Sequence, residues 1–107
     1  MNGFPIIVIA EFRAFPGKET LFMERTRELM QSIRSHEGVL IHSFQQNEDD
    51  PSSFIFYEQY ASEKALKDHG ADKNVALWRE ELPHMAQRLS WRRFSLIEYF
   101  RTAAPLP

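Results

Sequence analysis

Titratable side chains beside an aromatic strand are the part of this sequence best suited to chemistry. Residues 54–60 predict a strand, and Ser62 is placed to cap a short helix directly after it. His69 lies about two turns further along this helix. A neutral imidazole can take a proton from an acidic phenol and return it, so His69 is the candidate acid–base group. The structural alternative is a helix-end histidine that hydrogen-bonds carbonyl groups.

His42 and Glu58 lie on two predicted neighbouring strands, among apolar residues. His42 either lines the same cavity as His69 or lies in a subunit interface. A carboxylate in an apolar strand must be hydrated, paired or protonated. Glu58 therefore either pairs with an arginine across strands or subunits, or orients His69 or a substrate hydroxyl. The candidate arginines are Arg13, Arg92, Arg93 and Arg101.

The remaining histidines, His36 and His84, are predicted to be surface or loop residues. The four histidines show no His-x-x-x-His spacing or other local metal-ligand pattern. The chain has no cysteine, which removes thiolate nucleophiles, disulfides and the usual structural zinc sites. Dinucleotide and phosphate-loop motifs are also absent from the sequence. We therefore expect neither a metal nor a cofactor.

Aromatic residues make up 13% of the chain, and nine of its 107 residues are phenylalanine. A domain of this size buries only about two-thirds of its unfolded surface. So much aromatic surface indicates that part of it is buried against a partner subunit or a ligand. Tyrosine and tryptophan can stack on a flat ring and offer one hydrogen bond each, although core packing is the alternative for each residue. The predicted pocket residues are Phe12, His42, Phe44, Tyr57, Glu58, Tyr60 and Trp78.

Charge and hydropathy exclude several classes of protein. The formal net charge is -2 and the basic residues are scattered, which argues against a nucleic-acid partner. The sequence has no apolar stretch long enough to span a bilayer, so we expect no membrane association. The first residues lack the basic start and apolar core of a signal peptide. We expect a cytoplasmic protein.

The pattern of apolar residues predicts one domain with the element order β-α-β-β-α-β. The predicted strands are residues 6–15, 39–46, 54–60 and 91–100. The predicted helices are residues 18–35, 62–69 and 73–88, with a break at Gly70 and a kink near Pro83. This order is the ferredoxin-like α+β fold, with helices on one face of a four-stranded antiparallel sheet. Residues 6–10 are apolar in both strand phases, so we expect a second subunit on the other face.

Short motifs along residues 6–100 resemble, in their order and spacing, the antibiotic biosynthesis monooxygenase (ABM) family of dimeric α+β barrels. The motifs are FPGKE at 15–19, EGVL at 37–40, DP at 50–51, YEQY at 57–60 and SEKAL at 62–66, followed by His69. The resemblance implies a single ABM-type domain with a core at residues 6–100 and a tail at 101–107. It also implies a homodimer whose sheets pack face to face, with a pocket between each sheet and its helices.

Members of this family include cofactor-independent oxygenases of quinols and polycyclic phenols, haem-degrading enzymes and an isomerase. The haem branch uses an asparagine, a tryptophan and an iron-binding histidine at positions that correspond here to Phe12, His69 and Arg79, and none matches. The resemblance therefore favours a cofactor-independent monooxygenase of a small aromatic, quinol-like substrate, with His69 as acid and base. The alternatives are a cofactor-free isomerase of a small metabolite and a non-catalytic small-molecule-binding dimer.

Overall fold

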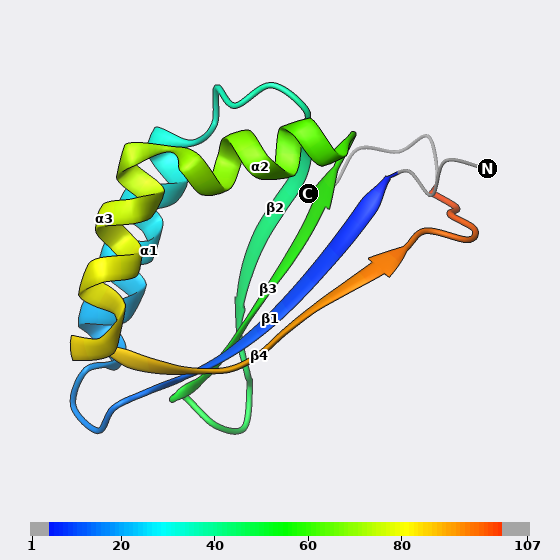
Figure 1. Ribbon diagram of the computed structural model, residues 1–107. Coiled ribbons are helices and arrows are strands. Elements are labelled where there is room, and N and C mark those ends of the chain that lie inside the picture. Colours follow the sequence, from blue (N-terminus) through cyan, green and yellow to red (C-terminus); the bar gives the residue numbers. More distant parts are fainter. Residues whose placement is uncertain (1–4, 102–107) are drawn as a thin grey trace.

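A computed structural model describes residues 5–101, and within them a four-stranded antiparallel sheet carries helices on one face (Figure 1). The strands are β1 (Ile6–Ala14), β2 (Val39–Gln46), β3 (Ser53–Tyr60) and β4 (Ala86–Ser95). The helices are α1 (Glu19–Ser32), α2 (Glu63–Ala71) and α3 (Lys73–Glu81), followed by a 3₁₀ turn, η1 (Leu82–His84). The strand order is β2-β3-β1-β4. The predicted ferredoxin-like fold is therefore confirmed.

All the helices lie on one side of the sheet, and α1 and α3 pack against each other (Figure 1). Helix α2 follows β3 over one end of the sheet and leads into α3 (Figure 1). None of the helices within the described residues is long and apolar enough to cross a membrane.

The core between the sheet and the helices is aromatic. Phe22 of α1 is fully buried, and its ring centroid lies 5.1 Å from that of Phe54 and 5.8 Å from that of Phe12. Phe12 also meets Phe56 edge-on at 5.4 Å, a geometry that aromatic pairs favour. Many of the phenylalanines are therefore packed within the chain itself, and an interface or ligand is not needed to bury them.

Local sequence sets the ends of α2 and α3. The side chain of Ser62 accepts a hydrogen bond from the backbone N–H of Ala65, so the predicted cap of α2 is present. Gly70 lies inside α2, and the break comes at Asp72 instead. Asp72 ends α2 and caps α3, because its carboxylate accepts from the N–H groups of Asn74 and Val75.

Strand β4 begins five residues earlier than predicted, at Ala86 and not at residue 91. The predicted helix over 73–88 is correspondingly too long, because Pro83 lies in the first turn of η1 and α3 ends at Glu81. From Ala86 the backbone pairs with Ala14, and the ladder continues to a pair between Ser95 and Ile6. The predicted tail lies outside the described residues apart from residue 101.

Candidate acid–base site

An apolar cavity of about 270 Å³ lies between the sheet and helices α2 and α3. Strands β1 and β3 and helices α2 and α3 contribute apolar side chains to its walls. These include Phe12, Phe56, Leu66, Val75 and Trp78. Its polar side chains could fix the orientation of a small molecule. The polar residues are His42, Glu58, Tyr60, His69, Arg79 and Arg88.

The structure brings most of the predicted site residues to this cavity. His69 and five of the predicted pocket residues line it, and these five are Phe12, His42, Glu58, Tyr60 and Trp78. Tyr57 and Phe44 do not line the cavity. Tyr57 pairs with Ile9 on the face away from the helices, because neighbours along a strand face opposite sides and Glu58 faces the cavity. Phe44 stacks on Phe54, with ring centroids 5.3 Å apart, and belongs to the core.

Glu58 is buried, and its partners differ from those predicted. The hydroxyl of Tyr60 donates to Oε1 of Glu58, and Nε2 of His42 lies 3.7 Å from Oε2. The strand register explains this arrangement, since His42 is directly opposite Glu58 across β2 and β3. Burial raises the pKa of Glu58 to about 6, although the hydrogen bond from Tyr60 opposes this shift. The carboxyl group is therefore poised to exchange a proton near neutral pH.

Three of the four arginines predicted to pair with Glu58 have other partners. Arg13 pairs with Asp50, Arg92 with Glu11 and Arg93 with Glu63. Those carboxylates lie at or near the surface, where each pair keeps contact with water. Glu58 is thus left to the uncharged partners of the cavity.

The surroundings of His42 do not stabilise a positive charge on its ring. Its Nδ1 atom is buried and has no hydrogen-bond partner within residues 5–101. Burial, together with repulsion from His69 and His36, lowers its pKa to about 4. His42 is therefore neutral at pH 7 and presents an imidazole that can accept or donate one hydrogen bond.

His69 is held by a hydrogen-bonded chain that leads away from the cavity. Its Nδ1 atom lies 3.1 Å from Nδ1 of His36, and Nε2 of His36 lies 3.0 Å from Oδ2 of Asp72. This leaves Nε2 of His69 as the ring nitrogen available to the cavity. Burial and repulsion from His36 lower the pKa of His69 to about 4, so the imidazole is neutral at pH 7.

The sequence of the chain matches a known family over most of its length. The profile of the antibiotic biosynthesis monooxygenase (ABM) family matches residues 5–81. The chain belongs to this family. Among curated proteins, the uncharacterized protein sll1783 of Synechocystis is 29% identical over 65 residues, which are 61% of this chain and 44% of that protein. The match therefore spans less than half of that relative.

Solved structures share the ABM fold at low sequence identity. A candidate antibiotic biosynthesis monooxygenase from Nitrosomonas europaea has a TM-score of 0.83 at 21% identity, covering 91% of this chain and 94% of that chain. PA3566 from Pseudomonas aeruginosa has a TM-score of 0.76 at 22% identity, covering 90% of this chain and 95% of that chain. At these identities the likeness is one of fold, so the site must be argued from its own residues.

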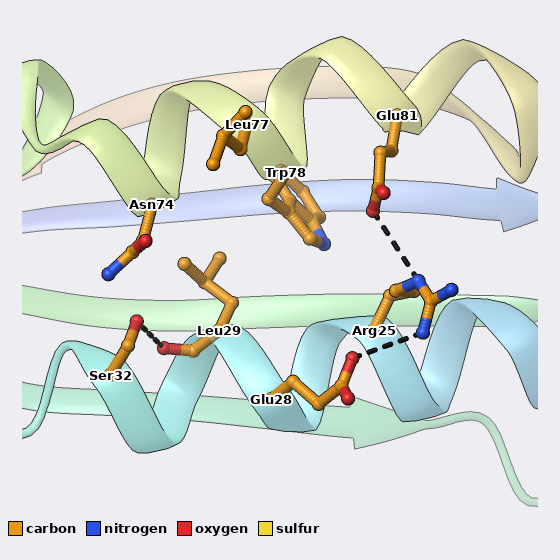
Figure 2. Close-up of a pocket in the computed structure, with 8 residues that line it drawn as sticks. All are labelled: Arg25, Glu28, Leu29, Ser32, Asn74, Leu77, Trp78 and Glu81. Carbon is orange, nitrogen blue, oxygen red and sulfur yellow. Dashed lines mark hydrogen bonds and ion pairs between the residues drawn. The ribbon is translucent and has the colours of Figure 1, made fainter.

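A second hollow of this ABM domain lies between α1 and α3, on the outer side of the helices (Figure 2). Figure 2 shows Arg25 of α1 bridging Glu28 and Glu81, with nitrogen–oxygen distances of 3.2 and 3.6 Å. Leu29 and Trp78 line both this groove and the inner cavity. The charged groups of the groove pair with one another at the surface, so the inner cavity is the better candidate for chemistry.

Sequence reasoning missed the role of His36, which it predicted to be a surface or loop residue. The side chain of His36 is only 17% exposed and bridges His69 and Asp72. No local motif joins these residues, because α1, α2 and α3 are needed to bring them together. Local spacing likewise did not show that donor atoms of His42, Glu58 and His69 lie within 4.8 Å of one another. Among the described residues, these three could hold a metal ion.

Proposed function

We propose that this ABM protein is a cofactor-independent monooxygenase of a small aromatic, quinol-like substrate, with His69 as its acid–base group. One observation carries the proposal. His69 lines the apolar cavity while its Nδ1 atom is engaged with His36, so Nε2 is free to meet a substrate. A neutral imidazole in that position can accept a phenolic proton.

Proton removal is the step that the protein has to supply. When the phenolic O–H bond breaks, its proton bonds to Nε2 of His69 and an electron-rich anion remains. This anion can give electrons to O₂ directly. For an anthrone-type substrate, a ring CH₂ group and O₂ yield C=O and H₂O, so the substrate itself supplies the electrons and no redox cofactor takes part.

The walls of the cavity suit a flat ring and its anion. Phe12, Phe56 and Trp78 meet edge-on, with centroids 5.4 to 5.8 Å apart, and give the cavity aromatic surface. Arg79 and Arg88 also line the cavity, and their positive charges would favour the phenolate over the neutral phenol. An apolar site with cations at its edge thus supports the first step of the proposed reaction.

A homodimer is part of the proposal because the face of the sheet without helices carries large apolar side chains. The register places Ile41, Gln59, Ile7 and Phe94 in one row across the four strands. Ile41 and Phe94 are each about 40% exposed, at 39% and 43%. A second copy of the chain on this face would bury that row, as the ABM resemblance implies.

Glu58 favours one alternative function, the isomerisation of a small metabolite. Its raised pKa of about 6 lets it carry a proton near neutral pH, while His69 is an unprotonated base in the same cavity. A base and an acid that face one substrate can move a proton from one carbon to another without O₂. The two functions differ in whether O₂ is consumed.

Oxygen uptake with a panel of quinols and anthrones tests the proposal. We expect uptake by the wild type, in the presence of a chelator, and a loss of about 10²-fold or more in His69→Ala. His84→Ala is the matched control, because His84 is exposed and does not line the cavity. The proposal fails if no quinol supports uptake, or if His69→Ala leaves the rate unchanged. Uptake that a chelator abolishes would also contradict it.

A further inference from the structure

His69 connects the inner cavity with a separate recess on the surface. The cavity holds about 270 Å³, the recess holds about 400 Å³, and His69 lines both. His36 and Asp72 line the recess and do not line the cavity. Their side chains are 17% and 24% exposed, so both reach water. The chain of hydrogen bonds from His69 therefore runs from an apolar site toward solvent.

The hydrogen bonds fix which nitrogen of His69 carries its proton. The Asp72 carboxylate can only accept, so Nε2 of His36 donates to it across 3.0 Å. When His36 is neutral, its Nδ1 atom must accept, and it accepts from Nδ1–H of His69 across 3.1 Å. His69 then has no proton on Nε2. The arrangement therefore selects the tautomer that can act as a base toward the cavity.

We propose that His36 and Asp72 are positioning residues that set the tautomer of His69 and take over its positive charge when it accepts a proton. This inference rests on the proposed function, because it assigns partners to the same acid–base group. It adds two residues and a surface recess to the site.

The transfer balances in protons and charge. A substrate O–H bond breaks and its proton bonds to Nε2 of His69. The Nδ1–H bond of His69 then breaks, and that proton bonds to Nδ1 of His36. His69 is again neutral, and His36 is an imidazolium ion beside the carboxylate of Asp72. The reverse transfer returns the proton to the cavity later in the reaction.

This relay of a proton from His69 to His36 moves the positive charge away from a buried histidine. A pKa of about 4 makes His69 alone a weak base, since burial disfavours its charged form. His36 has water on one side and a carboxylate at 3.0 Å, so a positive charge is better placed there. Desolvation alone would raise the pKa of Asp72. Hydrogen bonds from His36 and from the N–H groups of Val75 and Asn74 outweigh this effect and hold the pKa below its usual value. Asp72 therefore stays charged.

Other charged groups around the relay do not interrupt it. On the cavity side, Arg79 repels a positive charge on His69, whereas His42 is neutral. On the recess side, Glu37 lines the opening with negative charge, whereas the charge of Asp68 is paired with Lys64. The electrostatic gradient thus favours the movement of positive charge from His69 outward to His36.

Asp72→Asn is the sharpest test. Asparagine keeps the helix cap, but it exchanges donor and acceptor in the hydrogen bonds that link residue 72, His36 and His69. Its amide oxygen can still accept from the N–H groups of Asn74 and Val75, since asparagine caps helices as well as aspartate. Its NH₂ group would donate to Nε2 of His36, so His36 would donate from Nδ1 to His69. The proton of His69 would then move to Nε2, where it blocks the base.

Nitrogen-15 NMR of histidine-labelled protein measures the tautomer without any substrate. We expect His69 to carry its proton on Nδ1 in the wild type at pH 7 and on Nε2 in Asp72→Asn. Asp68→Asn is the matched control, because Asp68 lines the recess but pairs with Lys64. A wild-type His69 protonated on Nε2, or a tautomer that Asp72→Asn does not change, overturns the proposal.

Turnover provides the second measurement. With an active quinol, Asp72→Asn and His36→Ala are each expected to lose about 10²-fold in rate, as for loss of a positioned base, while Asp68→Asn keeps the wild-type rate. Equal melting temperatures of Asp72→Asn and Asp68→Asn would separate this loss from unfolding. Wild-type rates in both relay variants overturn the proposal. If the tautomer switches as expected but no substrate consumes O₂, the proposed function fails and the positioning role stands.

Discussion

Nε2 of His42 lies 3.7 Å from Oε2 of Glu58, yet the two residues do not form an ion pair at neutral pH. Burial lowers the pKa of His42 to about 4 and raises that of Glu58 to about 6. Above pH 6 the histidine is neutral beside a carboxylate, and between pH 4 and 6 both groups are neutral. Below pH 4 the histidine is charged, but the carboxyl group is already protonated. The cavity therefore disfavours a positive charge on His42, in agreement with the apolar residues around it.

Stability should fall on acidification from pH 7 to pH 5. His42 and His69 have pKa values of about 4 in the folded protein, below the 6.5 of an ordinary histidine. The unfolded chain therefore binds more protons between pH 6.5 and 4. Glu58 opposes this effect, because its pKa of about 6 exceeds its usual 4.5 and the folded state gains its proton first. The effect of two histidines is larger than that of one carboxyl group. From pH 7 to pH 5 we therefore expect the free energy of unfolding, measured with urea, to fall by a net amount on the order of 2 kcal/mol.

The sign of this change is the informative result. A free energy of unfolding that stayed level or rose from pH 7 to pH 5 would show that the histidines keep ordinary pKa values in the folded protein. The description of the cavity as a site that disfavours charged histidines would then be wrong.

His42→Leu should make the protein less sensitive to acid. Leucine removes one group that must be deprotonated for folding, and it leaves no buried Nδ1 without a partner. Glu58 keeps the hydrogen bond from Tyr60. We expect the unfolding free energy at pH 7 to change by no more than about 1 kcal/mol, and the pH dependence contributed by histidine to fall by about half.

His84→Leu is the matched control for this variant, because His84 is exposed. It should retain the full wild-type dependence on pH. The expectation for His42 does not survive if the two variants respond to acid alike.

The sequence was informative wherever a property depends on neighbours along the chain. Runs of strand-favouring residues located β1 to β3, and the place of Ser62 directly after the third predicted strand gave the cap of α2. The alternation of side chains along a strand held information that was not used. Tyr57 and Glu58 are adjacent, so they cannot both face one cavity. The start of β4 was wrong, because the apolar residues near Pro83 fit a helix as well as a strand.

The site itself depended on contacts that no local pattern contains. His36 follows α1, His69 lies in the last turn of α2 and Asp72 caps α3, and the packing of three helices brings their side chains together. The pairing of His42 with Glu58 required the register between β2 and β3, which an irregularity between Val39 and Ile41 shifts. A bulge of this kind has no reliable signature in one sequence. The aromatic cavity was therefore predictable in outline, and its acid–base partners were not.

Two glycines with nearly equal backbone angles allow a matched test of packing beneath α2. Gly17 and Gly38 have φ of +80° and +78°. A Cβ atom at Gly17 would meet nothing within 4 Å, whereas one at Gly38 would lie 2.6 Å from Cβ of Ala65 in α2. Gly17→Ala should therefore cost about 1 kcal/mol from its backbone conformation alone. Gly38→Ala should cost about 2 to 4 kcal/mol, because overpacking adds to the same strain.

Chemical denaturation of the two variants measures this difference directly. Equal losses would mean that α2 can move away from residue 38 without cost. The hydrogen bond between the N–H of Ala61 and the carbonyl of Gly38 makes such freedom unexpected, because it holds the start of α2 to this loop.

The face of the sheet without helices should determine whether the protein self-associates. Phe94 is 43% exposed and lies directly across from Ile7, in the row that also contains Ile41. A glutamate at this position would place a charge in the interface of the proposed dimer, where it would have to be buried without a partner. We expect Phe94→Glu to convert a dimer to a monomer at micromolar concentration, measured by sedimentation velocity.

Leu77→Glu separates this effect from a general gain in solubility. Leu77 is 58% exposed, but it lies on the outer groove between α1 and α3, away from the sheet (Figure 2). The same change of an apolar side chain to a charge should therefore leave the dimer intact. If Leu77→Glu dissociates the dimer and Phe94→Glu does not, the helices and not the open face of the sheet form the interface. In that arrangement the row of Ile7, Ile41 and Phe94 would need another partner to cover it.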